Sequence, residues 1–282
     1  MGRIRRSRKT AAVRCVLPLV VAAYVLCGCG GGGDPLSQVK ASAQKTIGVH
    51  WLRYQLAFDR PRLFEPSLQV AGGRAVFNVD ARLGYEVLTL RERGGGSRLL
   101  WLDVTPTAFL VDPDPPPAGV LPAGKIWISA GYSGANAVAA QAEGLSAELP
   151  LDEIAWGAQT ATRIRTSVVG HVPMAEYRVV VDLTKALSAA RTAHLRSIAA
   201  AIAGERRAGG VARLSLLVWV NGPGFVGRID ETVPGAGLGA VTFMFTSYTL
   251  RYTGTLPPSS QIVPLESLSP GGRSIWSVAT GS

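Results

Sequence analysis

The sequence predicts an α+β fold that consists mostly of one large antiparallel β-sheet with helices packed on it. Three observations support this prediction. Segments of alternating apolar and polar residues recur along the chain, short glycine-rich turns separate many of them, and an amphipathic helix interrupts the series. Short connections favour antiparallel hairpins, because parallel neighbouring strands need long crossovers.

The first predicted strand, residues 50–58, shows the alternation clearly. One face carries Leu52, Tyr54, Leu56 and Phe58, and this period of two is typical of a strand. Similar segments lie at residues 74–80, 85–92, 98–104, 125–130, 161–170, 176–183, 211–221, 225–233 and 241–253.

Turn and loop signals separate these strands. Gly72-Gly73, the three glycines at 94–96 and Asn-Gly-Pro-Gly at 221–224 predict short turns. The stretch Asp-Pro-Asp-Pro-Pro-Pro at 112–117 predicts a rigid surface connection, because proline lacks a backbone donor and favours extended backbone. Strand-like sequence continues on both sides of it, so we place no domain boundary there.

Two regions are predicted to be helical. Residues 135–143 and 151–158 form a short helical region in the middle of the chain. Further on, Thr184 is predicted to cap a longer helix over residues 185–203, which ends at Gly204. Its apolar stripe must pack on the sheet, and it consists of Leu187, Ala190, Ile198, Ala201 and Ile202.

One predicted strand is apolar on both faces. Within residues 211–221, Leu214, Leu216 and Val218 lie on one face of the strand, and Leu217 and Trp219 lie on the other face. Strands of this kind are covered on both sides or line an internal cavity. The pattern is a first indication that the fold could hold a ligand.

The amino-terminal residues have the order of a secretory signal. A basic segment with no acid precedes an uninterrupted apolar run at residues 16–26. Eleven residues of helix cover only about 16 Å, roughly half of a ~30 Å hydrocarbon core, so this run is too short for a stable span. The basic residues are Arg3, Arg5, Arg6, Arg8, Lys9 and Arg14.

The end of the apolar run resembles a bacterial lipobox. Leu26, Cys27, Gly28 and Cys29 place an aliphatic residue at position −3, glycine at −1 and cysteine at +1. The resemblance implies a diacylglyceryl group on Cys29 and cleavage after Gly28; an ordinary secretory signal is the alternative. The glycines at 30–33, with Asp34 and Pro35, predict a flexible tether.

Charge and cysteine content narrow the class of protein. Six of the 29 basic residues lie in the predicted signal, which leaves 23 against 19 acids, a net charge of +4. No clustered basic and aromatic surface indicates nucleic-acid binding. All three cysteines lie at or before position 29, so we expect neither a disulfide nor a cysteine–histidine metal site in the mature domain.

Candidate catalytic motifs are weak. Gly-Tyr-Ser-Gly-Ala at 131–135 resembles the nucleophile elbow of α/β-hydrolases, with Ser133 as nucleophile. His171 or His194 would be the base and Asp152 or Asp182 its partner. That fold needs parallel strands, whereas the downstream sequence is hairpin-like, so a glycine and serine turn is the better interpretation and no catalytic residue is assigned.

Gly-Pro-Gly-Phe-Val-Gly at 222–227 matches the dinucleotide fingerprint by letters. The fingerprint needs a following helix, yet residues 225–233 resemble a returning strand, so a hairpin turn explains the match better. Neither the three histidines nor any paired carboxylates indicate a metal site, and we expect no metal and no cofactor.

The order of the parts resembles the actinobacterial lipoproteins of the LppX and LprG type, which share the half-barrel fold of the lipoprotein carrier LolA. The resemblance covers most of residues 38–265. The segments that carry it are Lys-Ile-Trp-Ile at 125–128, Tyr-Arg-Val-Val-Val-Asp-Leu at 177–183 and Leu-Val-Trp-Val-Asn at 217–221.

The resemblance implies a curved half-barrel sheet with helices packed over its concave face, which enclose an apolar pocket for acyl chains. Each acyl CH2 removed from water contributes about 0.8 kcal/mol, so such a pocket needs no catalytic group. We therefore expect a non-enzymatic carrier or chaperone for an acyl lipid or lipoglycan. The predicted pocket residues are Leu187, Ile198, Leu214, Leu216 and Val218.

The expected organisation is a signal peptide at 1–28, a lipidated cysteine and tether at 29–37, a folded domain at 38–265 and a tail at 266–282 whose glycine and serine content favours disorder. We expect a monomer held on the outer face of the cell membrane by its lipid, with an envelope transport protein as a candidate partner. An envelope module that binds a protein and has no ligand cavity is the main alternative, followed by a serine hydrolase.

Overall fold

The computed structural model describes ten stretches of the chain. They are residues 33–65, 68–81, 83–92, 96–105, 108–112, 121–131, 147–193, 195–232, 240–249 and 255–268. Gly33–Ser282 forms one compact unit. Cys29, Gly28, Ser133, His194, most of the proline-rich stretch, the predicted helix at 135–143 and the segment 270–282 lie outside the described residues.

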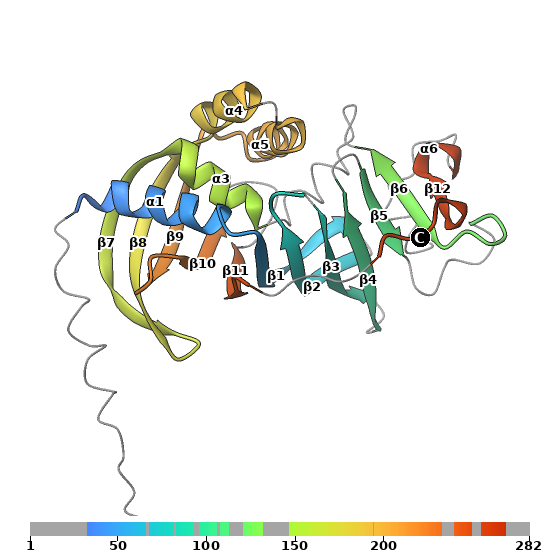
Figure 1. The fold of residues 1–282 in the computed structure, drawn as a ribbon, viewed down its shortest axis with the longest axis horizontal. Helices are drawn as coiled ribbons and strands as arrows, with labels where there is room; N and C mark the ends of the chain where they lie inside the picture. Colours follow the sequence, from blue (N-terminus) through green and yellow to red (C-terminus); the bar gives the residue numbers. More distant parts are fainter. Residues whose placement is uncertain are drawn as a thin grey trace, which may run out of the picture. The chain divides into compact units, whose positions relative to one another are not determined.

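The main feature is an open sheet of 12 strands in the order β12-β6-β5-β4-β3-β2-β1-β11-β10-β9-β8-β7 (Figure 1). Every described ladder is antiparallel except the pairing of β6 with β12. This architecture confirms the predicted α+β fold with a large antiparallel sheet. The strands are β1 (Trp51–Glu65), β2 (Leu68–Asn78), β3 (Leu83–Glu92), β4 (Ser97–Val104), β5 (Ala108–Asp112), β6 (Trp127–Gly131), β7 (Ala158–Val169), β8 (Val172–Asp182), β9 (Arg213–Asn221), β10 (Val226–Thr232), β11 (Ala240–Ser247) and β12 (Ile262–Pro264).

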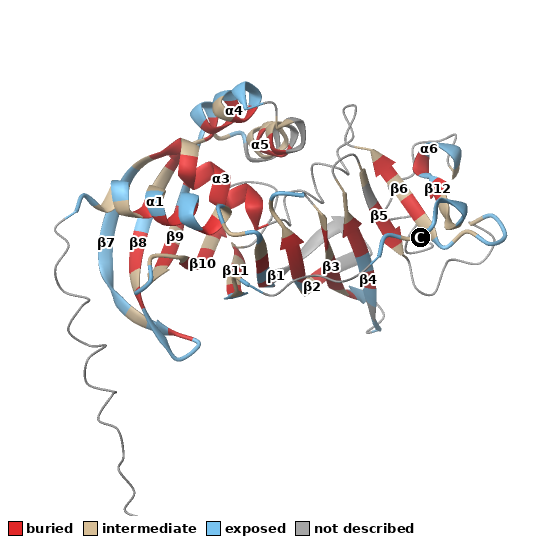
Figure 2. Ribbon diagram, in the orientation of Figure 1, coloured by how far each residue is buried: buried red, intermediate tan, exposed pale blue. Residues whose placement is uncertain are grey.

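The predicted alternation of β1 is confirmed. Leu52, Tyr54 and Leu56 are buried, whereas Arg53 and Gln55 are exposed. Because side chains alternate across a strand, the buried set defines the inner face of the sheet, which we call the inner face throughout. Buried residues continue along the inner face from strand to strand (Figure 2). One core cluster joins the inner faces of the strands to the helices.

Three helices pack on one part of the sheet and a fourth packs on two of these helices; the first of the four was not predicted. Helix α1 (Pro35–Ile47) begins after Asp34, whose carboxylate accepts hydrogen bonds from the amides of Leu36 and Ser37. It contacts β7 to β10 and α3 (Glu148–Gly157), while α4 (Leu183–Thr192) and α5 (Arg196–Gly209) pack on each other and on α3 (Figure 1). A short helix, α6 (Leu265–Leu268), contacts β6 and β12.

The single helix predicted over residues 185–203 is wrong in its extent. The structure has two helices, α4 and α5, which pack on each other. The cap was also misassigned: Asp182, not Thr184, accepts the hydrogen bonds from the first amides of α4. Helix α5 continues past Gly204 to Gly209, and Gly210 ends it with a left-handed φ of 61°, which glycine adopts without steric cost.

The connection between β9 and β10 confirms the predicted hairpin in place of a dinucleotide-binding turn. The Asn221 side-chain oxygen accepts a hydrogen bond from the Phe225 amide, and Gly224 has a φ of 84°. Strand β10 then returns antiparallel to β9, so no helix follows the glycines. The two short strands β5 and β12 were not predicted.

The second face of β9 carries a small cluster rather than a second layer. Trp219 is buried there with Val169 and Met174. Its indole nitrogen donates to the Ser167 hydroxyl at 2.9 Å, and the Arg228 guanidinium lies over its ring. The apolar pattern on both faces of this strand is therefore explained without an internal cavity on this side.

Candidate ligand-binding site

The structure brings the five predicted pocket residues into one core cluster. Leu214, Leu216 and Val218 alternate along the inner face of β9, and Ile198 of α5 is fully buried. Leu187 of α4 is the one among them that reaches a hollow open to solvent. A role of these residues in holding a ligand stays a prediction.

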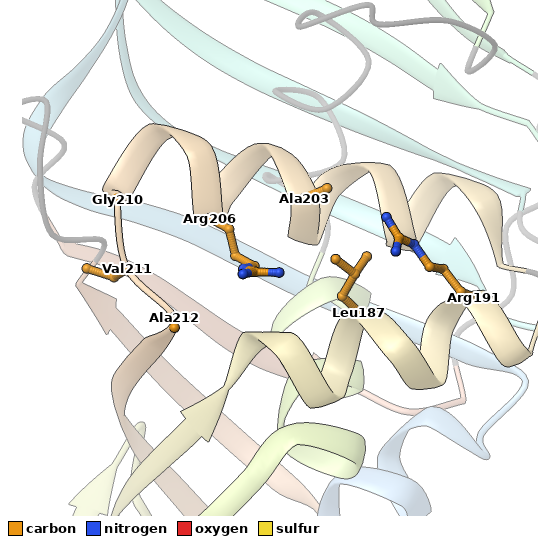
Figure 3. Close-up of a pocket in the computed structure, with 7 residues that line it drawn as sticks. All are labelled: Leu187, Arg191, Ala203, Arg206, Gly210, Val211 and Ala212. Carbon is orange, nitrogen blue, oxygen red and sulfur yellow. The ribbon is translucent and has the colours of Figure 1, made fainter.

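The hollow lies between α4 and α5 and has a volume of about 440 Å³ (Figure 3). Ligand pockets in proteins typically measure about 300–1,000 Å³, so its size suits a small ligand or one end of a long one. Its wall combines apolar and cationic side chains. The lining residues are Leu187, Arg191, Ala203, Arg206, Gly210, Val211 and Ala212.

Two arginines give the hollow its chemistry. Arg191 extends from α4 and Arg206 from α5, and both side chains lie in the space between the helices next to Leu187 (Figure 3). The guanidinium group binds carboxylate and phosphate through paired hydrogen bonds. The hollow can therefore accept an anionic group next to an apolar segment. Sequence reasoning missed both arginines, because an exposed arginine on a helix is ordinary.

The inner face of the other strands is apolar and buried as well. Leu88, Leu90 and Leu100 of β3 and β4 are at most 1% exposed, and Val111 and Ile128 continue the same face on β5 and β6. Among the described elements, β2 to β5 make their main contacts with other strands. This face differs from that of β7 to β10, which the helices cover directly.

Acidic side chains are buried on the inner face as well. Glu86 lies on β3 between Leu102 of β4 and Ala75 of β2, and burial holds its pKa well above its ordinary value. Asp103 of β4 is buried on the opposite face, since it is one residue from Leu102; burial, followed by the nearby charge of Asp112, raises its pKa to about 6. Three further acids converge beneath the helices: Glu153, Glu205 and Glu231.

The residues proposed for a hydrolase are not assembled among the described residues. His171 is exposed in the turn before β8, and Asp182 caps α4 at the other end of that strand. The 11 residues of β8 place them about 35 Å apart. Strand β6, which ends just before Ser133, pairs antiparallel with β5 and in parallel only with the three-residue β12 among the described strands, so the set of parallel strands that surrounds a nucleophile elbow is not present in the described sheet.

No protein-family model matches the chain, and no curated protein matches it. Among solved structures, the chain is similar to LprF from Mycobacterium bovis, with a TM-score of 0.46 and 14% identity over 81% of this chain and 100% of LprF. It is also similar to the lipoprotein LppX of Mycobacterium tuberculosis, with a TM-score of 0.45 and 10% identity over 76% of this chain and 95% of LppX. LppX is one of the lipoproteins that the sequence resemblance named.

Proposed function

We propose that this chain is an exported lipoprotein that holds an acyl lipid or lipoglycan between its sheet and its helices, as a carrier or chaperone. The observation that supports it most is the continuous apolar inner face, which extends beyond the part that α1 and α3 to α5 cover. Burying an acyl chain there contributes about 0.8 kcal/mol for each CH2. The chemistry requires no catalytic residue.

The hollow between α4 and α5 suits the polar end of such a ligand. Arg191 and Arg206 would bind a phosphate or carboxylate, while Leu187 and Val211 would contact the first carbons of the chain. Because α4 and α5 contact each other and α3, a small movement of this pair could open the way to the inner face.

Membrane attachment follows from the lipobox. We propose that residues 1–28 are removed, that Cys29 carries the lipid, and that the glycines up to Gly33 link it to α1 on the outer face of the membrane. Among the described residues, no helix combines the length and the apolar character that crossing a membrane requires. The anchor would keep a monomeric carrier next to its lipid source and to an envelope transport protein.

Mass spectrometry of organic extracts tests the proposal. The compact unit Gly33–Ser282 would be exported and purified without detergent, so that Asp34 is kept as the cap of α1. We expect a stoichiometric acyl lipid, and we expect Ala75→Trp on the inner face to reduce it. Ala57→Trp, on the exposed face of β1, is the matched control. An empty protein that takes up no offered lipid would contradict the proposal.

A protein-binding role is the second candidate, and one observation favours it. Ile164, Val168 and Val172 are exposed in the hairpin of β7 and β8, and β7 is an edge strand of the described sheet. If an envelope protein binds there, Val168→Asp should abolish co-purification of that protein from cross-linked membranes. The same variant should leave the recovered lipid unchanged.

A further inference from the structure

Three carboxylates from three different elements meet beneath the helices. Glu153 comes from α3, Glu205 from α5 and Glu231 from β10. Each offers one oxygen, and these oxygens all lie within 4.8 Å of one another. Residues far apart in the sequence therefore form one oxygen-lined site.

The fold places two of these acids at buried positions that ordinarily carry an apolar residue, and the third, Glu205, is partly buried. Glu231 follows Ile229 by two residues on β10, so both side chains point to the inner face. Glu153 lies on α3, whose residues are buried almost all round. Helix α5 brings Glu205 to the same place, because it contacts α3 directly.

Glu153 is the member that requires a partner. Its side chain is fully buried, and neither carboxylate oxygen accepts a hydrogen bond from any residue that the structure describes. An ionised carboxylate in such a position costs several kcal/mol unless it is paired. Both oxygens therefore need either a proton or a positive charge.

The neighbouring acidic side chains make an ionised Glu153 still less favourable. Burial is the main reason that the pKa of Glu153 rises to about 8; the adjacent Glu205 carboxyl group lowers it, and the charges of Glu231 and Asp152 raise it further.

We propose that Glu153, Glu205 and Glu231 form a binding site for a divalent cation of the calcium type. Calcium takes oxygen ligands at about 2.3–2.6 Å, so ligands on opposite sides of one ion lie about 5 Å apart, which agrees with the spacing of the three oxygens. A hard cation also prefers carboxylates to nitrogen or sulfur ligands. The bound ion would tie α3 and α5 to β10, and this inference does not depend on a lipid ligand.

Thermal unfolding of the full chain, purified with chelator and followed by tryptophan fluorescence, tests the site. Sites in extracellular modules bind calcium at about 0.1–1 mM. At a concentration about 100 times Kd, we expect CaCl2 to raise Tm by about 5–10 °C. Glu153→Gln and Glu231→Gln should each lose this rise.

Glu86→Gln is the matched control, because Glu86 is a buried acid on β3 that lies outside the cluster. This variant should keep the full response to calcium. In chelator, Glu153→Gln should be at least as stable as the wild type, since the change removes an uncompensated buried charge; its folding can therefore be checked independently. An unchanged Tm of the wild type in CaCl2, or a calcium response that survives in Glu153→Gln, would overturn the site. A response to MnCl2 or MgCl2 without one to CaCl2 would overturn the assignment to calcium.

Discussion

The two parts of the sheet bury the same kind of inner face in different ways. The part formed by β7 to β10 is packed against α1, α3 and α4, whereas β2 to β5 make their main described contacts with neighbouring strands. Both inner faces are apolar and buried. A buried sheet face needs a cover, and among the described elements the helices provide it for β7 to β10. The proposed function places the ligand against the other part, and the predictions below test this difference.

The buried acidic residues are also arranged differently in the two parts of the sheet. Beneath the helices, Glu153, Glu205 and Glu231 converge on one point. On β3 and β4, Glu86 and Asp103 lie in adjacent strands, but Glu86 pairs across the sheet with Leu102 rather than with an acid. The first arrangement offers three oxygens to one cation, whereas Glu86 and Asp103 lie on opposite faces of the sheet.

The largest expected effect is on packing. Leu151 of α3 and Leu88 of β3 are both fully buried, and truncation of a buried leucine to alanine costs about 2–5 kcal/mol. We expect Leu151→Ala to lie at the upper end of this range. Leu88→Ala should lie at the lower end in the lipid-loaded protein, because an acyl chain can fill the space. Urea unfolding of both variants, with and without lipid, measures the difference; equal losses under all conditions would contradict it.

The next effect is on pH dependence. Burial raises the pKa of Glu86 well above its ordinary value of 4.5, so the folded state binds this proton more tightly than the unfolded state. The stabilising contribution of Glu86 to the free energy of unfolding is therefore fully present below about pH 4.5, and it decreases as the pH rises through the pKa of Glu86 in the folded state. Glu86→Gln should flatten the fall in stability towards neutral pH, as measured by denaturant unfolding across this range. An unchanged slope would show that Glu86 is ionised at little cost.

A smaller effect is expected on ligand affinity. Arg206→Gln removes one charged donor from the hollow between α4 and α5, and a hydrogen bond to a charged group is worth about 1.5–3 kcal/mol. We expect at least about a tenfold weaker Kd for an acyl phosphate and no change for a neutral acyl ester, measured by titration calorimetry. Arg163→Gln, an exposed arginine on β7, is the control and should bind both ligands as the wild type does.

The smallest effect tests the attachment of α1 to the sheet. The Tyr177 hydroxyl of β8 donates a hydrogen bond to the Gln38 side-chain oxygen of α1 at 2.8 Å. Tyr177→Phe should cost about 0.5–1.5 kcal/mol of unfolding free energy. Hydrogen exchange should rise in residues 35–47 and stay unchanged in β3 and β4; a uniform rise would mean that α1 does not act as a local cover.

The local patterns predicted most of the sheet but little of its cover. The alternation of Leu52, Tyr54 and Leu56 identified β1, because one face of the strand is buried and the other is exposed. Helix α1 gave no such signal, since its buried residues are Val39, Ser42, Ala43 and Thr46, which are small or polar. Thr46 instead joins α1 to the sheet through its hydroxyl, which accepts a hydrogen bond from the Val226 amide of β10.

The candidate site depends even more than the helical cover on contacts between residues that are far apart in the sequence. The predicted pocket residues Leu187 and Ile198 followed from helical spacing, and the structure does place them in one core with β9. The break between α4 and α5 was missed because the apolar spacing continues across it, and this break creates the hollow with Arg191 and Arg206. One buried acid could have been predicted from the sequence, because Glu231 comes two residues after Ile229 on a predicted strand and therefore lies on the same face.

Photolabelling with an acyl lipid that carries a diazirine on its chain tests the central claim most directly. After irradiation of the loaded protein, peptide mapping should place the label on the inner faces of β3 and β4, with Leu88 and Leu100 among the labelled positions, and on α4 near Leu187. Label confined to the exposed residues Ile164 and Val168 of the β7–β8 hairpin, or no label at all, would contradict a lipid held between the sheet and the helices.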